Sequence, residues 1–139
     1  MTTKKHAATL LVLMVVGLTG LANAQMPTTI KAQVPFEFVV NGKTMPAGEC
    51  TIEAVNHGQT LLSIRSGNEH VYAVSIAEEP TKKSRGSVLV FHQYGDRYFL
   101  AGIRREGRIG YQLPASRLEG ELQARNVAER EFTLLASAK

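Results

Sequence analysis

The stretch from Val90 to Leu100, VFHQYGDRYFL, gathers more chemically active side chains than any other part of this chain. A histidine that acts as a general base needs a carboxylate within hydrogen-bond reach to orient its ring. Asp96 is the nearest carboxylate in the sequence, but Gly95 and Asp96 together are typical of a two-residue turn. In such a hairpin Asp96 lies roughly two rungs, or about 7 Å, from His92. The stretch is therefore predicted to be the tip of a β-hairpin and not a catalytic cluster.

The pairing expected in this hairpin makes four of its side chains candidate contacts for a ligand or a partner. Opposite residues of an antiparallel pair share a face, so His92 lies beside Phe99 and Tyr94 lies beside Arg97. Tyr94 and Arg97 are expected to form an aromatic–cation cross-strand pair. His92, Tyr94, Arg97 and Phe99 are thus the candidate ligand or partner surface. His92 would be a ligand-binding or titrating group there if its face lines a cavity.

Sequence signatures of other site chemistries are absent from the chain. His57, His70 and His92 are far apart and form none of the short pairings, such as HxH or HExxH, that bind zinc. No glycine-rich loop leads from a strand into a helix to hold a phosphate, and no serine sits in a GxSxG elbow. We therefore expect no catalytic residue, no metal ligand and no cofactor.

The N-terminus has the layout of a secretory signal peptide. Lys4 and Lys5 precede an apolar run, and Ala22 and Ala24 are the small residues that a signal peptidase reads. The run is shorter than the roughly 20 residues of a membrane-spanning helix. Residues 1–24 are therefore predicted to be removed, leaving no stable membrane span. The remaining residues, 25–139, would form a single β-rich domain that is exported to the periplasm or the extracellular space.

The charge of the expected mature chain gives little support for a nucleic-acid partner. Lys4 and Lys5 leave with the signal peptide, so the remaining 14 basic and 12 acidic residues give a net charge of only +2. The basic loop with Lys82, Lys83 and Arg85 is interpreted as a solvated turn, because short charge runs are common on surfaces. We therefore expect no nucleic-acid partner.

Alternating apolar and polar residues predict a succession of short β-strands. The clearest segment, TIKAQVPFEFVVN, places an apolar residue at every second position from Ile30 to Val40. Pro35 is expected to mark an edge or a bulge, and Asn41-Gly42 a tight hairpin turn. Further strands separated by turns follow as far as Gln112. The pattern predicts an all-β domain, an antiparallel meander of about eight strands closed as a small barrel or folded as a sandwich.

One short helix is expected before the last strand. The segment LPASRLEGELQARN offers Ser116 and Glu119 as a capping pair. Leu118 and Leu122 share one helix face at i, i+4, and we expect the helix to pack through them onto the sheet or across one end of the barrel. The last strand, EREFTLLAS, then returns to the sheet with Phe132 on its inner face.

The chain contains a single cysteine, Cys50, so it cannot form an intramolecular disulfide. In the segment ECTIEAV, Cys50 shares strand parity with Ile52 and Ala54, which are expected to face the core. A catalytic thiol also needs a neighbouring base to form its thiolate, and none is suggested nearby. Cys50 is therefore predicted to be a small core residue.

Three segments, VPFEFVVNGKTMPAGECTIE, VLVFHQYGDRYFL and LPASRLEGELQAR, together with the expected signal peptide, resemble a family of small exported proteins common in acidobacterial genomes. The family pattern is VPFxFxVxGKxLPAGxYTV, then an FHRYGDxYFL-like hairpin, then LPxSxxExEL. This chain departs from it at Cys50, where the family usually has an aromatic residue. The resemblance implies export and a shared fold, and no particular reaction.

Three classes of function stay open from the sequence. The first, which the lack of site signatures favours, is an exported, non-enzymatic interaction or structural module with an envelope or extracellular partner; a solid core would support it. The second is a lipocalin-like barrel that carries a small apolar ligand, in an apolar cavity of about 300 Å³ or more. The third is an enzyme with His92 as general base, which needs a carboxylate within hydrogen-bond reach of His92 in a cleft.

The signal peptide predicts the first residue of the mature protein. Cleavage after Ala24 should leave Gln25 as the N-terminus, because the small residues at positions 22 and 24 match the specificity of signal peptidase. N-terminal sequencing of exported protein checks this. Protein that retains Met1 and stays bound to the membrane would show instead that the apolar run is an anchor.

Overall fold

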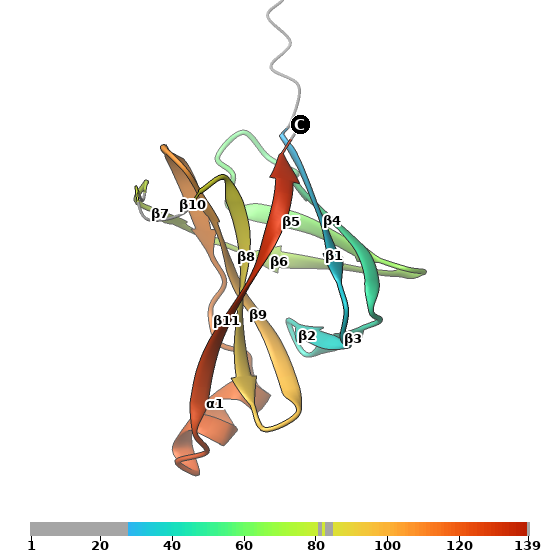
Figure 1. Ribbon diagram of the computed structural model, residues 1–139, viewed down its shortest axis with the longest axis vertical. Helices are drawn as coiled ribbons and strands as arrows, with labels where there is room; N and C mark the ends of the chain where they lie inside the picture. Colours follow the sequence, from blue (N-terminus) through green and yellow to red (C-terminus); the bar gives the residue numbers. More distant parts are fainter. Residues whose placement is uncertain (1–27, 81, 83–84, 139) are drawn as a thin grey trace, which may run out of the picture.

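The computed structural model describes residues 28–80, 82 and 85–138 (Figure 1). The predicted signal peptide, with Ala22 and Ala24, and Lys83 of the basic loop lie outside the described residues. Within the described part, no helix is both long enough and apolar enough to cross a membrane. The elements are β1 (Thr29–Val34), β2 (Phe38–Val40), β3 (Lys43–Met45), β4 (Gly48–Ala54), β5 (Leu61–Ser66), β6 (Glu69–Val74), β7 (Ile76–Glu78), β8 (Ser87–Tyr94), β9 (Arg97–Arg105), β10 (Arg108–Gln112), α1 (Arg117–Ala124) and β11 (Glu129–Ala138).

The strands form a nearly closed, barrel-like ring, which confirms the predicted all-β class (Figure 1). Hydrogen-bonded neighbours run in the order β9-β8-β11-β1-β4-β5-β6. After the single residue Ser75 the chain continues as β7, which pairs with β10, and β10 pairs with β9. Every pair around this ring is antiparallel. With β6 and β7 taken as one interrupted strand, the ring agrees with the predicted number of about eight.

The strand order departs from a simple meander between β7 and β8, and again between β10 and β11, because β11 lies beside β8. β10, and not β8, lies beside β7, so β8, β9 and β10 follow the ring in reverse order. The connection over residues 79–86 can span at most about 26 Å. β7 and β8 are three strand spacings apart, which amounts to only about 14 Å. The chain is therefore long enough to cross to the far side of β9 and start β8 beside β11.

The β2–β3 hairpin is an addition to the ring and fills its lower opening. β2 pairs in parallel with β9, where Val39 is opposite Phe99. On the other side, Asn41 Nδ2 donates to the carbonyl of Tyr72 on β6 at 3.1 Å. Lys43 Nζ likewise donates to the carbonyl of His70 at 3.1 Å. The hairpin thus links β9 to β6 at the level where β10 has already ended.

The single strand predicted from residue 29 to 41 is interrupted between β1 and β2. Pro35 has no N–H to donate to a ladder, so the chain leaves β4 there and turns towards β9. The burial pattern nevertheless agrees with the predicted alternation, since Ile30 and Val34 before the break and Phe38 and Val40 after it are all buried.

Large side chains fill the inside of the ring. Phe38 and Phe91 meet edge to face with ring centroids 5.5 Å apart. The other large side chains that are fully buried in this core come from β1, β3, β4, β5, β8 and β9: Ile30, Val34, Met45, Ile52, Leu62, Ile64, Leu89 and Ile103. Cys50 is completely buried among the core residues, as predicted, and burial raises the pKa of its thiol to about 12. The thiol is therefore protonated and unreactive at neutral pH.

The β8–β9 hairpin has the predicted register and turn. His92 is opposite Phe99, and Tyr94 is opposite Arg97. Gly95 has a φ of 64°, while Asp96 has no positive φ. A positive φ at the first turn residue alone is the signature of a type II′ turn, whose twist matches that of the flanking strands.

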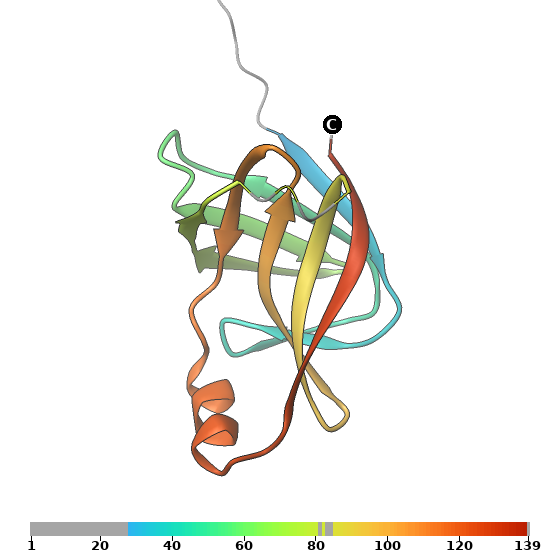
Figure 2. The same ribbon diagram turned by 60° about the vertical axis from the view of Figure 1, so that its left-hand side comes forward.

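The helix begins as predicted but packs through a different residue. The side chain of Ser116 accepts a hydrogen bond from the Glu119 backbone N–H at 3.3 Å and caps α1. Leu118 and Leu122, which were expected to pack onto the sheet, are only half-buried, and Glu119 is the fully buried residue of α1. Figure 2 shows α1 beside the lower end of β11, with the linker from β10 running down to it.

The tightest backbone approach in the sheet yields a testable prediction. A Cβ at Gly102 would lie 2.5 Å from the carbonyl oxygen of Tyr111, whereas a Cβ at Gly120 of α1 would meet nothing within 4 Å. Gly102→Ala should lower the free energy of unfolding by about 1–3 kcal/mol, because backbone must move to admit the methyl group. The matched control Gly120→Ala should raise it by up to about 1 kcal/mol. Urea unfolding measures both, and equal effects would contradict the close approach of β9 and β10.

Candidate functional site

His92 lies between two carboxylates that are distant from it in sequence. Its Nδ1 is 2.7 Å from Oε1 of Glu119 on α1. Its Nε2 is 3.5 Å from Oε1 of Glu129 at the start of β11. His92 therefore joins α1 and β11 to β8.

Glu119 is the most buried carboxylate of this cluster, with 3% of its surface exposed. Its Oε1 accepts a hydrogen bond from the hydroxyl of Tyr94 at 3.1 Å in addition to the contact with His92. The Tyr94 hydroxyl also lies 3.1 Å from Glu129 Oε2 and accepts from Gln123 Nε2 at 2.9 Å. Burial, and then the neighbouring carboxylates, raise the pKa of Tyr94 well above its ordinary value. Tyr94 is thus a neutral donor held at the centre of the cluster.

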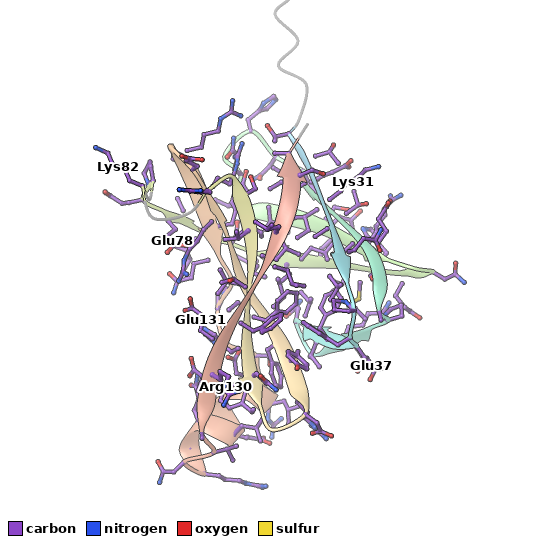
Figure 3. The ribbon with its side chains drawn as sticks, in the orientation of Figure 1. Lys31, Glu37, Glu78, Lys82, Arg130 and Glu131 are labelled. Carbon is purple, nitrogen blue, oxygen red and sulfur yellow. The ribbon has the colours of Figure 1, made fainter. Side chains whose placement is uncertain are left out.

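The polar cluster continues along the outer face of the sheet. Arg104 on β9 makes a two-pronged contact with Glu131 on β11, at 2.7 and 3.3 Å. Its Nε also lies 3.8 Å from Glu78 at the end of β7. Figure 3 shows Glu78 and Glu131 on the same side of the molecule. The Arg104 guanidinium lowers the pKa of Glu131, which is directly opposite His92 across the β8–β11 pair. One row of charges therefore connects β7, β9, β11, β8 and α1.

The chemistry available to this cluster is hydrogen bonding and proton exchange. The contact between His92 and Glu119 provides the carboxylate that the sequence could not locate. In the part of the chain that the structure describes, no serine, threonine or cysteine side chain is hydrogen-bonded to His92. A nucleophilic mechanism needs such a neighbour. The described residues also contain no group of three or more His, Cys, Asp or Glu side chains arranged to hold a metal ion.

A cavity of about 180 Å³ lies at the seam between β2 and β6, next to Glu119. Val39 and Val40 of β2 line one side, and Ala73 and Val74 of β6 line the other. Glu119 contributes a charged side chain to its lining. This cavity lies where β10 ends and the β2–β3 hairpin begins to fill the opening, so it is separate from the filled interior of the ring. His92 is not among the residues that line it.

The four predicted surface residues fall into two groups. Tyr94 and Phe99 are almost completely buried, so they do not present a contact surface, and their rings meet edge to face with centroids 5.7 Å apart. His92 is half-buried beneath α1, and Arg97 is exposed at the hairpin tip. The predicted exposed Tyr94–Arg97 pair is therefore wrong, because α1 and β11 cover the Tyr94 side of this face. Only Arg97 of the four is fully open to a partner.

An exposed apolar row lies elsewhere, on the outer face of β6 and β7. Tyr72, Val74 and Ile76 are 52%, 63% and 57% exposed, respectively. They alternate with the inward-facing Ala73 and Ser75, which are buried. Tyr72 and Val74 also line the seam cavity. We call these three residues the apolar row. Together with the cavity it forms one continuous surface.

Sequence reasoning missed Glu119 as a site residue, although it had identified the capping pair that contains it. A Glu at the third helical position is usually explained by its backbone contacts at the helix start. Its carboxylate lies instead against His92 and Tyr94. Sequence reasoning also missed Arg105, which is buried and whose Nε has no hydrogen-bond partner among the residues that the structure describes. The pattern RRxGR gave no sign that this arginine faces inward.

Comparison with known proteins found no matching family model, no matching curated protein and no matching solved structure. The site is therefore interpreted from its own geometry.

The Tyr94 hydroxyl gives a prediction for the polar cluster. Tyr94→Phe should lower the free energy of unfolding by about 1–3 kcal/mol, because it removes a donor from a buried carboxylate. Tyr72→Phe is the matched control, since Tyr72 is half exposed and should change stability by less than about 0.5 kcal/mol. Urea unfolding at neutral pH measures both. Equal values would show that the Tyr94 hydroxyl does not hold α1 to the sheet.

Proposed function

We propose that this protein is an exported, non-enzymatic interaction module that contacts a protein of the cell envelope or the extracellular space. The observation that carries the proposal is the apolar row of Tyr72, Val74 and Ile76 on the outside of a filled ring. Isolated apolar residues are common on protein surfaces, but a contiguous row beside a cavity is typical of a contact site. A partner that covers the row removes three large apolar side chains from water.

The filled interior supports this function over that of an apolar-ligand carrier. A carrier of the lipocalin type needs an interior cavity, whereas Phe38, Phe91 and Ile103 lie inside this ring with at most 1% of their surface exposed. The seam cavity, at about 180 Å³, is smaller than the usual small-molecule site and opens at the side. Among the described residues, large side chains occupy the interior that a hydrophobic cargo would need.

The polar cluster supports a structural role over a catalytic one. Both ring nitrogens of His92 lie close to carboxylates of the chain itself. A general base needs a free nitrogen that reaches the substrate. The contacts of His92, Tyr94 and Glu119 account for the docking of α1 without any reaction. We accordingly assign the cluster to the stability of the module and the apolar row to its contact with the partner.

Site-specific photo-crosslinking in the exporting host tests this proposal. A photoreactive residue at position 74 should give a defined adduct with one partner, because Val74 is at the centre of the apolar row. The same residue at position 135 is the matched control, since Leu135 is an exposed apolar side chain on β11, at 78% exposure. Ile76→Asp should abolish the adduct at position 74 while circular dichroism stays unchanged.

Two outcomes would contradict the proposed contact. If positions 74 and 135 gave the same adducts, the apolar row would not be a specific surface. If the adduct at position 74 survived Ile76→Asp, the contact would not depend on the row. An adduct with a second copy of this chain would identify the partner as the protein itself.

A further inference from the structure

The seam cavity is lined by both apolar and polar residues. Its apolar part includes Val39, Ala73 and Leu113, which come from β2, β6 and the linker before α1. Asn41 and Glu119 are among its polar lining residues. Glu119 is nine-tenths buried or more, so a charged side chain has been placed almost out of water at the edge of this space. Buried charges require partners, which makes the second oxygen of Glu119 important.

Only one oxygen of the Glu119 carboxylate is occupied. Oε1 is in contact with both His92 Nδ1 and the Tyr94 hydroxyl. Among the residues that the structure describes, none donates a hydrogen bond to Oε2. Asn41, which is exposed, donates from Nδ2 to the carbonyl of Tyr72, and no described group donates to its Oδ1. Two residues that line the cavity therefore have an acceptor oxygen without a donor among the described residues.

The charged side chains around Glu119 are mostly negative. Three carboxylates, Glu119, Glu129 and Glu131, face His92 on α1 and β11. Arg104 pairs with Glu131, and His92 lies between the other two carboxylates. One negative charge remains in excess even when His92 is protonated. An occupant with a positive charge and several hydrogen-bond donors would pair with the open oxygen of Glu119, whereas an anion would be repelled.

We propose that the seam cavity binds a primary ammonium group on a short apolar stem, either a free alkylamine or the side chain of a lysine. The ammonium donates to Glu119 Oε2 and Asn41 Oδ1, and the stem packs between Val39 and Ala73. A volume of about 180 Å³ equals that of roughly six water molecules, which suits a chain of this length. This site does not depend on the apolar row having a partner.

The same geometry predicts selectivity against guanidinium groups. An arginine-type group binds a carboxylate best with two parallel hydrogen bonds, one to each oxygen. Because His92 and Tyr94 already occupy Oε1, only a single oxygen remains for the occupant. An ammonium is compact and donates in any direction, so it makes full use of one oxygen. The site should therefore prefer an ammonium over a guanidinium with the same stem.

Titration of the purified protein with butylammonium, followed by nitrogen–proton NMR at constant ionic strength, tests the proposal. Saturable shifts are expected for the amides of Val39, Ala73 and Leu113. Glu119→Gln should weaken binding at least about tenfold, because it removes the charge on the accepting oxygen. The matched control Glu121→Gln removes a carboxylate from the exposed side of the same helix and should leave the affinity unchanged. Butanol and butylguanidinium should both bind more weakly than butylammonium.

A second variant keeps the test decisive if Glu119→Gln fails to fold. Ala115 lines the cavity but is exposed, so Ala115→Phe should fold normally and block entry. The absence of saturable shifts with butylammonium, or equal affinities in the original chain, Glu119→Gln and Ala115→Phe, would overturn the proposal. Nα-acetyl-lysine N-methylamide separates the two sources. Binding comparable to butylammonium assigns the site to a lysine side chain of a partner, and its exclusion assigns the site to free amines.

Discussion

The packing of α1 against β8 and β11 depends on one constraint, the buried carboxylate of Glu119. An unpaired buried carboxylate costs several kcal/mol, because its charge has lost contact with water. His92 and Tyr94 of β8 supply hydrogen-bonding contacts to it, and its place in the first turn of α1 adds the favourable field of the helix N-terminus. Detaching the helix from the sheet would therefore leave these polar groups exposed or without their hydrogen-bond partners.

This constraint explains why a helix of eight residues stays in place although its leucines are only half-buried. A helix of this length is unstable in isolation and must be stabilised by tertiary contacts. Here those contacts are polar and specific, and they join β8, β11 and α1 at fixed positions. The same contacts hold Glu119 at the edge of the seam cavity, so one network both docks the helix and shapes the candidate site.

The opposite face of the same strands is stabilised in a different way. Phe36 stacks on Tyr98 with ring centroids 3.7 Å apart and meets Phe132 edge to face at 5.6 Å. These aromatic side chains continue the core beyond the barrel-like ring of strands, where Phe36 also contacts Phe91. The ends of β8, β9 and β11 near α1 are thus covered by aromatic side chains on one face. The helix and the charged side chains around His92 cover the other face. Such two-sided cover keeps the extended strands from fraying.

The seam exists because two ways of closing the ring meet there. Above it, β10 closes the ring through backbone hydrogen bonds to β7 and β9. Below it, the β2–β3 hairpin closes the opening through side chains, chiefly Asn41 and Lys43. Side chains cannot fill the space as evenly as a continuous ladder does, and a small cavity remains between the two. The apolar row borders it on β6 and β7, which places the two proposed contact surfaces side by side.

The sequence alone determined the local structure of this protein. Period-two alternation and the turn pairs Asn41-Gly42 and Gly95-Asp96 predicted the strands and the register of the β8–β9 hairpin, because these depend on neighbours in the chain. The burial of Cys50 followed from its parity with Ile52 for the same reason.

Only the tertiary structure decided which distant residues meet. Glu119 lies far from His92 in the chain, and their contact depends on where β11 enters the ring and how α1 precedes it. The parallel pairing of β2 with β9 after Pro35 likewise depends on an opening that exists only once the ring has formed. Sequence periodicity reports which face a side chain occupies, but not what covers that face, and this is why Tyr94 was predicted to be exposed and is buried.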